Sequence, residues 1–168
     1  MPDRPSTPSA PAARRSPAEQ ARFEAILADM FEQRIAFNQV LGLKVAAIGA
    51  QSSSLRFDMR PELVGHFLYG RLHGGVISAT LDATAGLALM AAMAERHAAD
   101  TADQVVHRFS RLGTIDLRVD FLRQGVGKHF VATGEVTRLG GRVGSVLMKL
   151  VNDDGVLIAT GAAAYMVA

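Results

Sequence analysis

The sequence predicts an α+β domain in which an antiparallel β-sheet wraps around one long central helix. The stretch from His73 to Met93 is apolar on nearly all sides, as expected of a helix enclosed by other elements. Four strand-like runs follow it, joined by short, turn-rich connections that are typical of antiparallel strands. The apolar face of such a sheet must be covered, and the central helix supplies the cover.

The first 17 residues differ in composition from the rest of the chain. They hold five of the six prolines and show no apolar period, so we expect residues 1–17 to be a disordered extension. Residues 18–168 have the length of one ordinary domain. The chain has no Cys, and the apolar segment of a signal peptide is missing before Ile26. We therefore expect a cytoplasmic protein.

The net charge of +2, from 18 basic and 16 acidic residues, arises in the extension. Three arginines, Arg4, Arg14 and Arg15, stand there against Asp3, so the domain itself is formally neutral and binding to nucleic acid is not expected. No metal site is expected either, because the five histidines show no ligand spacing with acids: His66, His73, His97, His107 and His129.

Helix signals begin at Ser16. Ser16 is a good N-cap, Pro17 suits the first helical position, and Glu19 follows three residues after the cap. Apolar residues then recur with a helical period, which predicts an amphipathic helix that ends near Phe37 or Asn38.

The strand candidates fall before and after the central stretch. Two precede it, and we interpret residues 61–72 as irregular and Glu95–Arg111 as a polar loop. The turns at 125–128, 140–141 and 153–155 predict that the four later strands form a meander. The six predicted strands are Leu41–Ala50, Ser53–Met59, Thr114–Leu122, His129–Leu139, Arg142–Asn152 and Val156–Ala168.

The central stretch carries the candidate chemistry. Gly74 and Gly75 leave the N–H groups of a helix start uncovered, where a substrate carbonyl can approach them. A carboxylate inside an apolar helix, Asp82, is a candidate general base or nucleophile. The structural alternatives are a tight turn at the glycines and an Asp82 that bonds Ser78, Thr84 or a strand arginine. The stretch is long enough to span a membrane, but its acid and glycines favour a buried core helix, and no membrane span is expected.

The segment HGGVISATLDATAG is similar to the signature of the PaaI-like hotdog-fold acyl-CoA thioesterases, in which an acid follows nine residues after the His of His-Gly-Gly. The resemblance continues through PELVGHFLYGRLHGG, LGTIDLRVDFLRQG and TRLGGRVGSV, and covers about Leu41 to Ala168. It is greatest to the bacterial medium- and long-chain acyl-CoA thioesterases. It implies a hotdog fold and hydrolysis of a fatty acyl-CoA to free acid and coenzyme A, which is part of the substrate; no other cofactor is implied.

The resemblance also implies roles for individual residues. Asp82 would be the catalytic carboxylate, and the N–H of Gly74 or Gly75 would polarise the thioester carbonyl. His73 would hold the turn. The family places its sites between subunits of a homodimer or homotetramer, so Thr114 would orient water opposite the Asp82 of a partner chain.

One position departs from the family pattern. Many relatives have Asn upstream of His-Gly-Gly, and its nearest counterpart here is His66. The Gly-His-Phe around His66 resembles hotdog 3-hydroxyacyl dehydratases, whose catalytic Glu is replaced by Thr80. A dehydratase that uses His66 and a non-catalytic acyl-CoA-binding protein are the two alternatives to the thioesterase.

Coenzyme A carries phosphates, for which arginines are suitable partners. Arg123, Arg138 and Arg142 lie on or beside the late strands, and Arg142, next to the glycine turn at Gly140, is the preferred candidate. We expect the acyl chain to lie beside the central helix in a slot lined by Leu81, Leu89 and Phe67.

Overall fold

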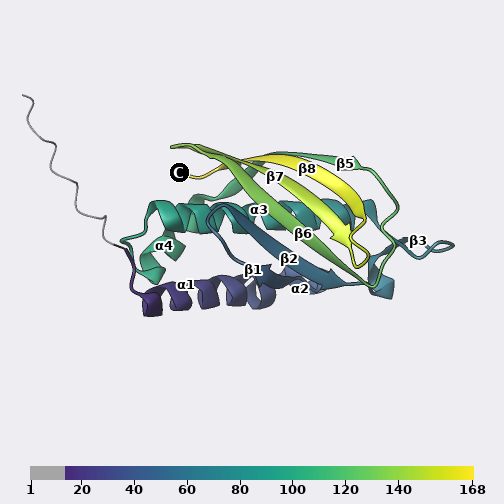
Figure 1. The fold of residues 1–168 in the computed structure, drawn as a ribbon, viewed down its shortest axis with the longest axis horizontal. Coiled ribbons are helices and arrows are strands. Elements are labelled where there is room, and N and C mark those ends of the chain that lie inside the picture. The colour runs from purple at the N-terminus through teal and green to yellow at the C-terminus, as the bar shows by residue number, and fades with distance from the viewer. Residues whose placement is uncertain (1–13) are drawn as a thin grey trace, which may run out of the picture.

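The protein is described by a computed structural model that covers residues 14–168, so the expectation for residues 1–13 falls outside the described part. A six-stranded antiparallel sheet curves around the long helix α3 (Gly74–Arg96). In Figure 1, α3 lies between strands β7 and β8 on one side and helix α1 (Pro17–Asp29) on the other. The predicted α+β arrangement is confirmed.

The sheet has the order β1-β2-β6-β7-β8-β5. All six predicted strands are present, and the later four differ from the predicted bounds by no more than two residues at each end. Their bounds are β1 Lys44–Ala47, β2 Ser52–Asp58, β5 Gly113–Phe121, β6 His129–Leu139, β7 Val143–Asn152 and β8 Leu157–Met166.

The predicted meander of four strands is wrong in one connection. β6, β7 and β8 follow one another as hairpins, but β5 pairs with β8 and β6 pairs with β2. The segment between β5 and β6 is instead bound to the β7–β8 end of the sheet. The N–H groups of Leu122 and Arg123 donate to the Ile158 carbonyl, and Asn152 donates to the Val126 carbonyl. These bonds carry the chain across the sheet, so β5 becomes an edge strand.

The N-terminal helix begins as predicted, because Ser16 Oγ accepts the Glu19 N–H at 3.2 Å. It is not continuous to Phe37. A π-helical turn η1 (Met30–Arg34) ends α1, and Ile35 adopts extended backbone before α2 (Ala36–Leu41). Ile35 packs against the core at this break.

Two segments interpreted as irregular contain regular structure. Residues 61–72 form a 3-10 turn η2 (Pro61–Leu63) and a small hairpin of β3 (Val64–His66) and β4 (Arg71–Leu72). The expected polar loop holds α4 (Ala102–Arg108) and η3 (Phe109–Arg111). Thr101 and Gln104 form a capping box at the start of α4, and their three-residue spacing was the overlooked signal.

Helix α3 is buried because the sheet approaches it closely. A Cβ on Gly134 would lie 3.2 Å from the Thr84 carbonyl, and one on Gly144 would lie 2.5 Å from Leu89 Cδ2. Glycine at these strand positions lets the backbone sit on the helix. The helix has the length and mean hydropathy of a membrane span, but 72% of its apolar window is buried inside the protein, as in a core helix.

The residues just before α1 contact the C-terminal end of α3. The Arg15 guanidinium donates to the carbonyls of Ala94, His97 and Asp100 at 2.7, 2.9 and 3.3 Å. Arg14 pairs with Glu95. Arg15 thereby provides donors to carbonyls at the end of α3 and in the turn that follows it.

Candidate active site

Asp82 lies midway along α3 on the side that faces β5 and β8. Thr114 Oγ1, at the start of β5, donates to Asp82 Oδ1 at 3.0 Å. The Tyr165 hydroxyl, near the end of β8, lies 2.5 Å from the same oxygen and 2.7 Å from the Asp82 carbonyl oxygen. Thr114 and Tyr165 are register partners on the two adjacent strands. Two hydroxyls thus fix one carboxylate oxygen.

Tyr165 is a hydrogen-bond donor at working pH. Its side chain is buried, with 3% of its surface exposed. Burial raises the pKa of the Tyr165 hydroxyl, and its hydrogen bond to the Asp82 carboxylate raises it further. The phenol therefore stays protonated and orients Asp82. Sequence reasoning missed Tyr165, because it sits in an apolar run, AAAYMVA, where nothing separates it from core residues.

The structural alternatives for Asp82 do not hold. Ser78 Oγ donates to the Gly74 carbonyl at 3.0 Å, and Thr84 Oγ1 donates to the Thr80 carbonyl at 2.7 Å. No arginine of residues 14–168 forms an ion pair with Asp82. Within that range Oδ2 accepts no hydrogen bond, so this oxygen is available to a water or a substrate.

The start of α3 is shaped by His73. Its Nδ1 accepts the Gly75 N–H at 2.9 Å, so His73 caps its own helix and the Gly75 donor is engaged. The Gly74 N–H has no partner among the described residues. Gly65 allows β3 to press against this turn, since a Cβ there would lie 2.5 Å from His73 Cα. Of the two candidate carbonyl donors, Gly74 is the free one.

The acid and the helix start do not converge within one chain. Asp82 is eight positions after Gly74, which corresponds to about 12 Å along the helix axis and about 80° around it. An oxyanion donor lies about 3 Å from the carbonyl oxygen, and the attacking atom lies about 3 to 3.5 Å from the reacting carbon. One bound thioester cannot satisfy both groups of the same chain.

The relation between Thr114 and Asp82 differs from the expectation. Thr114 was expected opposite the Asp82 of a partner chain, whereas it bonds the Asp82 of its own chain. The register of β5 on β8 explains this, because it sets Thr114 beside Tyr165 and over the middle of α3.

His66 belongs to the β3–β4 hairpin, which precedes the helix start and projects from the body (Figure 1). Its ring stacks on Phe67 with centroids 5.7 Å apart and lies 4.7 Å from the Tyr69 ring. The Nδ1 atom is buried without a hydrogen-bond partner among the described residues. His66 therefore lies at the same end of α3 as Gly74, and not beside the Asp82 of its own chain.

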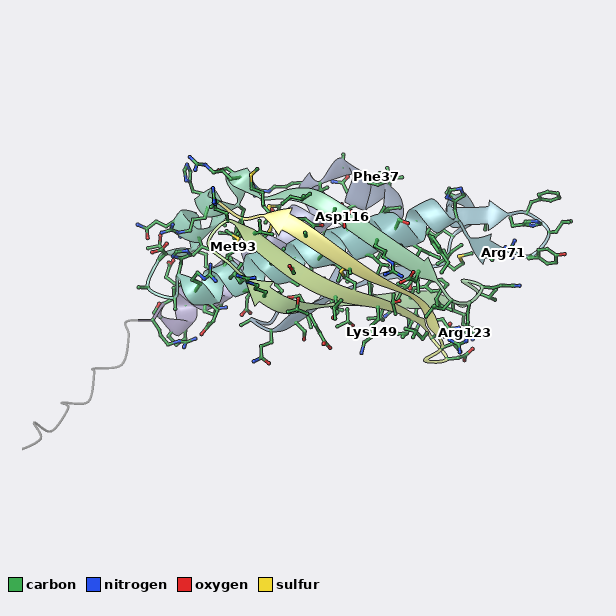
Figure 2. All side chains as sticks on the ribbon, turned by 90° about the horizontal axis from the view of Figure 1, so that it is seen from above. Phe37, Arg71, Met93, Asp116, Arg123 and Lys149 are labelled. Atoms are coloured by element: carbon green, nitrogen blue, oxygen red, sulfur yellow. The ribbon has the colours of Figure 1, made fainter. Side chains whose placement is uncertain are left out.

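The cationic candidates fall at the two ends of α3. Arg123 follows β5, donates to the Leu157 carbonyl at 3.0 Å and lines a cavity beside Gly74. Arg138 and Arg142 flank the β6–β7 turn at Gly140, whose carbonyl accepts from Arg96 at the end of α3. Figure 2 shows Arg123 and Met93 toward opposite ends of the molecule. The four predicted coenzyme residues are therefore not one cluster.

The expected acyl slot is not present beside Leu81 and Leu89. Both side chains are fully buried in the core, and Phe67 is 87% exposed at the hairpin tip. The sheet packs too closely on α3 to leave a channel there. A cavity of about 360 Å³ does lie at the helix start, with Gly74, Ile77 and Phe121 among its lining residues.

Residues 14–168 contain no group of three or more His, Cys, Asp or Glu side chains that could hold a metal ion. The groups that the structure brings together at Asp82 are one carboxylate and two hydroxyls.

Comparison with known proteins gives consistent matches. A sequence profile of the thioesterase superfamily matches residues 69–159. The medium/long-chain acyl-CoA thioesterase YigI of Salmonella typhimurium is 40% identical over 150 residues, covering 89% of this chain and 96% of the relative. YigI of Escherichia coli K12 is 39% identical over the same shares of the two chains.

Solved structures agree in fold. A Shewanella oneidensis protein related to the thioesterase superfamily has a TM-score of 0.84 and 36% identity, covering 92% of this chain and 100% of its own. A crystal structure from Syntrophus aciditrophicus has a TM-score of 0.78 and 38% identity, covering 91% and 100%. These neighbours confirm the predicted hotdog arrangement of sheet and central helix.

Proposed function

Because the chain belongs to the thioesterase superfamily, we propose that it hydrolyses medium- and long-chain acyl-CoA thioesters to the free acid and coenzyme A. The observation that carries the proposal is the setting of Asp82. Thr114 and Tyr165 hold its Oδ1, and its Oδ2 remains free. The substrate class follows the named function of the YigI relatives, which match nearly the whole chain.

In the proposed reaction, the thioester carbonyl oxygen accepts a hydrogen bond from the Gly74 N–H, and developing negative charge is stabilised there. Asp82 Oδ2 takes a proton from a water that attacks the carbonyl carbon. The carbon–sulfur bond then breaks, and the proton passes to the leaving thiolate. Direct attack by Asp82, which gives an anhydride that water hydrolyses, uses the same groups.

The 12 Å between Asp82 and Gly74 implies that two subunits build each site. We propose a homodimer in which Asp82 of one chain faces the helix start of the other, and His66 arrives with that helix start. The sites still lie between subunits, as expected. In each site, however, Thr114 and Asp82 come from one chain, and the partner chain contributes Gly74.

Strand β5 is suited to join such a dimer. Its outer edge has no partner strand within residues 14–168, and Ile115 and Phe121 on it are 58% and 56% exposed. An edge strand presents unpaired N–H and C=O groups, with which another strand can pair. One end of β5 contacts the acid, because Thr114 bonds Asp82. The other end contacts the helix start, because the Phe121 ring lies 3.4 Å from where a Gly74 Cβ would be.

Pairing two copies of β5 antiparallel about their midpoint would therefore set Thr114 of one chain opposite Phe121 of the other. This two-fold arrangement brings each Asp82 toward the partner's helix start and produces two equivalent sites. Pairing of two such dimers would give the expected tetramer. We place the enzyme in the cytoplasm, where acyl-CoA is its substrate and no other cofactor takes part.

The acyl chain is proposed to lie in the cavity at the helix start, against Ile77, Phe121 and Leu122. Arg123 lies at the same cavity, whereas Arg138 and Arg142 lie at the far end of α3 and are retained as candidates for contact with coenzyme A phosphates.

A hydrolysis screen with short, medium and long acyl-CoA esters tests the function. Release of free thiol is expected to be greatest with medium and long chains and to be lost in Asp82→Asn, whose amide cannot accept the proton. Asp154→Asn, an exposed carboxylate in the β7–β8 turn, is the matched control. Normal turnover by Asp82→Asn would overturn the assignment.

Hydration of an enoyl thioester that depends on His66 would instead indicate a dehydratase, and binding without turnover would indicate an acyl-CoA-binding protein.

A further inference from the structure

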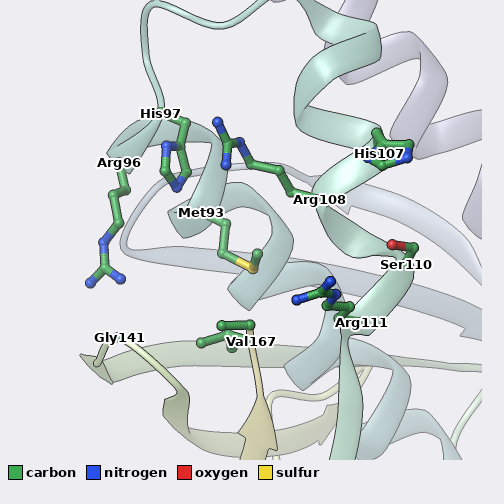
Figure 3. Close-up of a pocket in the computed structure, with 10 residues that line it drawn as sticks. Met93, Arg96, His97, His107, Arg108, Ser110, Arg111, Gly141 and Val167 are labelled. Carbon is green, nitrogen blue, oxygen red and sulfur yellow. The ribbon is translucent and has the colours of Figure 1, made fainter.

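A second cavity, of about 340 Å³, lies at the C-terminal end of α3. It is enclosed by the end of α3, by α4 and η3, by the β6–β7 turn and by the end of β8. Met93 and Val167 give it an apolar surface, and Arg96 and Arg111 lie on either side of them (Figure 3). The volume falls within the range of ligand pockets, about 300 to 1,000 Å³.

The lining is strongly cationic. Arg96, Arg108 and Arg111 carry three positive charges, and two histidines stand beside them. Asp100 pairs with Arg108 at 2.7 Å. Three arginines against this one carboxylate leave a net positive charge before the histidines are counted. Arginine forks of this kind suit phosphate groups.

A structural role at a helix end explains two of these arginines but not the third. Arg96 and Arg108 lie in the last turns of α3 and α4, where cations offset the negative ends of helices. Arg96 is also fixed to the carbonyls of Leu139 and Gly140. Arg111 lies beyond both helices and forms no ion pair or side-chain hydrogen bond with residues 14–168.

The cavity lies at the right distance from the candidate active site. From Asp82, Met93 is about 16 Å and Arg96 about 21 Å along the helix axis. About 13 bonds separate the sulfur of coenzyme A from its first phosphorus, which span about 15 Å at the reach of an extended peptide chain. The two sites are also joined by chain: Arg111 precedes Thr114 by three residues, and Val167 follows Tyr165 by two.

We infer that this cavity binds the phosphate-bearing end of acyl-CoA, the pyrophosphate and adenosine 3′-phosphate, while the thioester lies at Asp82. The inference rests on the proposed function and adds the place of the nucleotide. Arg111 and Arg96 contact the phosphates, and Met93 and Val167 pack against the adenine. The cavity beside Gly74 is too close to the carbonyl to take the pyrophosphate.

Two substrates separate this role from a general effect on the enzyme. Lauroyl-CoA carries the phosphates, and lauroyl-pantetheine has the same thioester without them. Arg111→Gln should raise KM for lauroyl-CoA by about tenfold, the loss of one charge-assisted hydrogen bond, with kcat nearly unchanged. The same variant should hydrolyse lauroyl-pantetheine at the wild-type kcat/KM. Lys149→Gln, an exposed cation on β7 outside the cavity, is the matched control and should match the wild type on both substrates.

An equal effect of Arg111→Gln on both substrates, or no effect on either, would overturn the proposal. Calorimetry with adenosine 3′,5′-bisphosphate measures nucleotide binding directly, and so tests the cavity even if the protein is not a thioesterase. If the wild type hydrolyses neither thioester but binds the nucleotide, and Arg111→Gln weakens that binding at least tenfold, the cavity is a nucleotide site in its own right and the placement of the substrate is wrong. Absence of binding and of hydrolysis contradicts both proposals.

Discussion

The Tyr165 hydroxyl lies 2.5 Å from Asp82 Oδ1 and joins β8 to the acid in the middle of the central helix. Together with Thr114 it fixes the direction in which the free Oδ2 points. The carboxylate is thereby a positioned group, and the three side chains form a unit whose parts come from α3, β5 and β8.

Tyr165→Phe removes one of the two hydroxyls without changing the shape of the ring. We expect kcat to fall by about tenfold or more, because a hydrogen bond to a charged group is lost, while KM changes little. Tyr69→Phe, on the only other tyrosine of the chain, is the control and should leave kcat unchanged. Since the pKa of Tyr165 is raised, its hydroxyl stays protonated, and the variant should retain the wild-type pH–rate profile below about pH 10. An unchanged kcat would show that Thr114 alone holds the acid.

Thr114→Val keeps the volume of the side chain and deletes its donor to Asp82. We expect a decrease in kcat comparable to that of Tyr165→Phe, and Thr114→Ser should restore most of it. Because both hydroxyls act on Oδ1, the double variant should lose less than the product of the two single effects. Steady-state kinetics of the four enzymes measure this coupling. Fully multiplicative losses would mean that the two hydroxyls act independently.

Arg15→Ala tests the contact between the N-terminal segment and α3. The guanidinium donates to the carbonyls of Ala94 in the helix and of His97 and Asp100 after it, so its removal should lower the free energy of unfolding by about 1 to 3 kcal/mol. Urea unfolding monitored by circular dichroism measures the change. Arg14→Ala removes an exposed ion pair with Glu95 and should cost less than about 1 kcal/mol. Equal losses in the two variants would refute the capping role.

The exposed edge of β5 offers a test of the dimer. In the proposed pairing, Ile115, which lies at the irregularity of β5 between Thr114 and Asp116, is close to the end of the partner's strand that carries Asp120. Ile115→Glu would set like charges against each other and weaken association, whereas Ile115→Lys would set opposite charges together. Sedimentation velocity should therefore show more monomer for the Glu variant than for the Lys variant. If both variants associate like the wild type, β5 is not the interface.

Most of the fold was predictable because periodicity and turn residues are local signals. The alternation in Leu55, Phe57 and Met59 and the glycine turn at Gly140 indicate strands and a hairpin without knowledge of any other segment. The position of β5 next to β8 was not predictable in this way. It depends on bonds between residues 122–126 and the far end of the sheet, which are tertiary contacts.

The candidate site was predictable only in part for the same reason. Asp82 and Gly74 are conspicuous, since an acid and a glycine pair are unusual in an apolar helix. Tyr165 is 83 residues away in sequence and reaches Asp82 only through the pairing of β8 with β5. Leu81 and Leu89 lie on the same helix as Asp82. Their burial could not be predicted from the sequence, because it depends on how closely the sheet approaches α3.

Subunit mixing tests most directly whether each site uses Asp82 of one chain and the helix start of another. Asp82→Asn lacks the acid, and Gly75→Val obstructs the helix start, so each alone should be inactive while circular dichroism shows a folded protein. In a mixed dimer, one site combines both lesions and the other combines Asp82 of the Gly75→Val chain with the intact helix start of the Asp82→Asn chain. Mixing the inactive proteins under conditions that allow exchange should therefore restore thioester hydrolysis, to about half of the wild-type activity per mixed dimer. If the mixture remains as inactive as its components while exchange of subunits is demonstrated, each site lies within a single chain and the two-subunit site is contradicted.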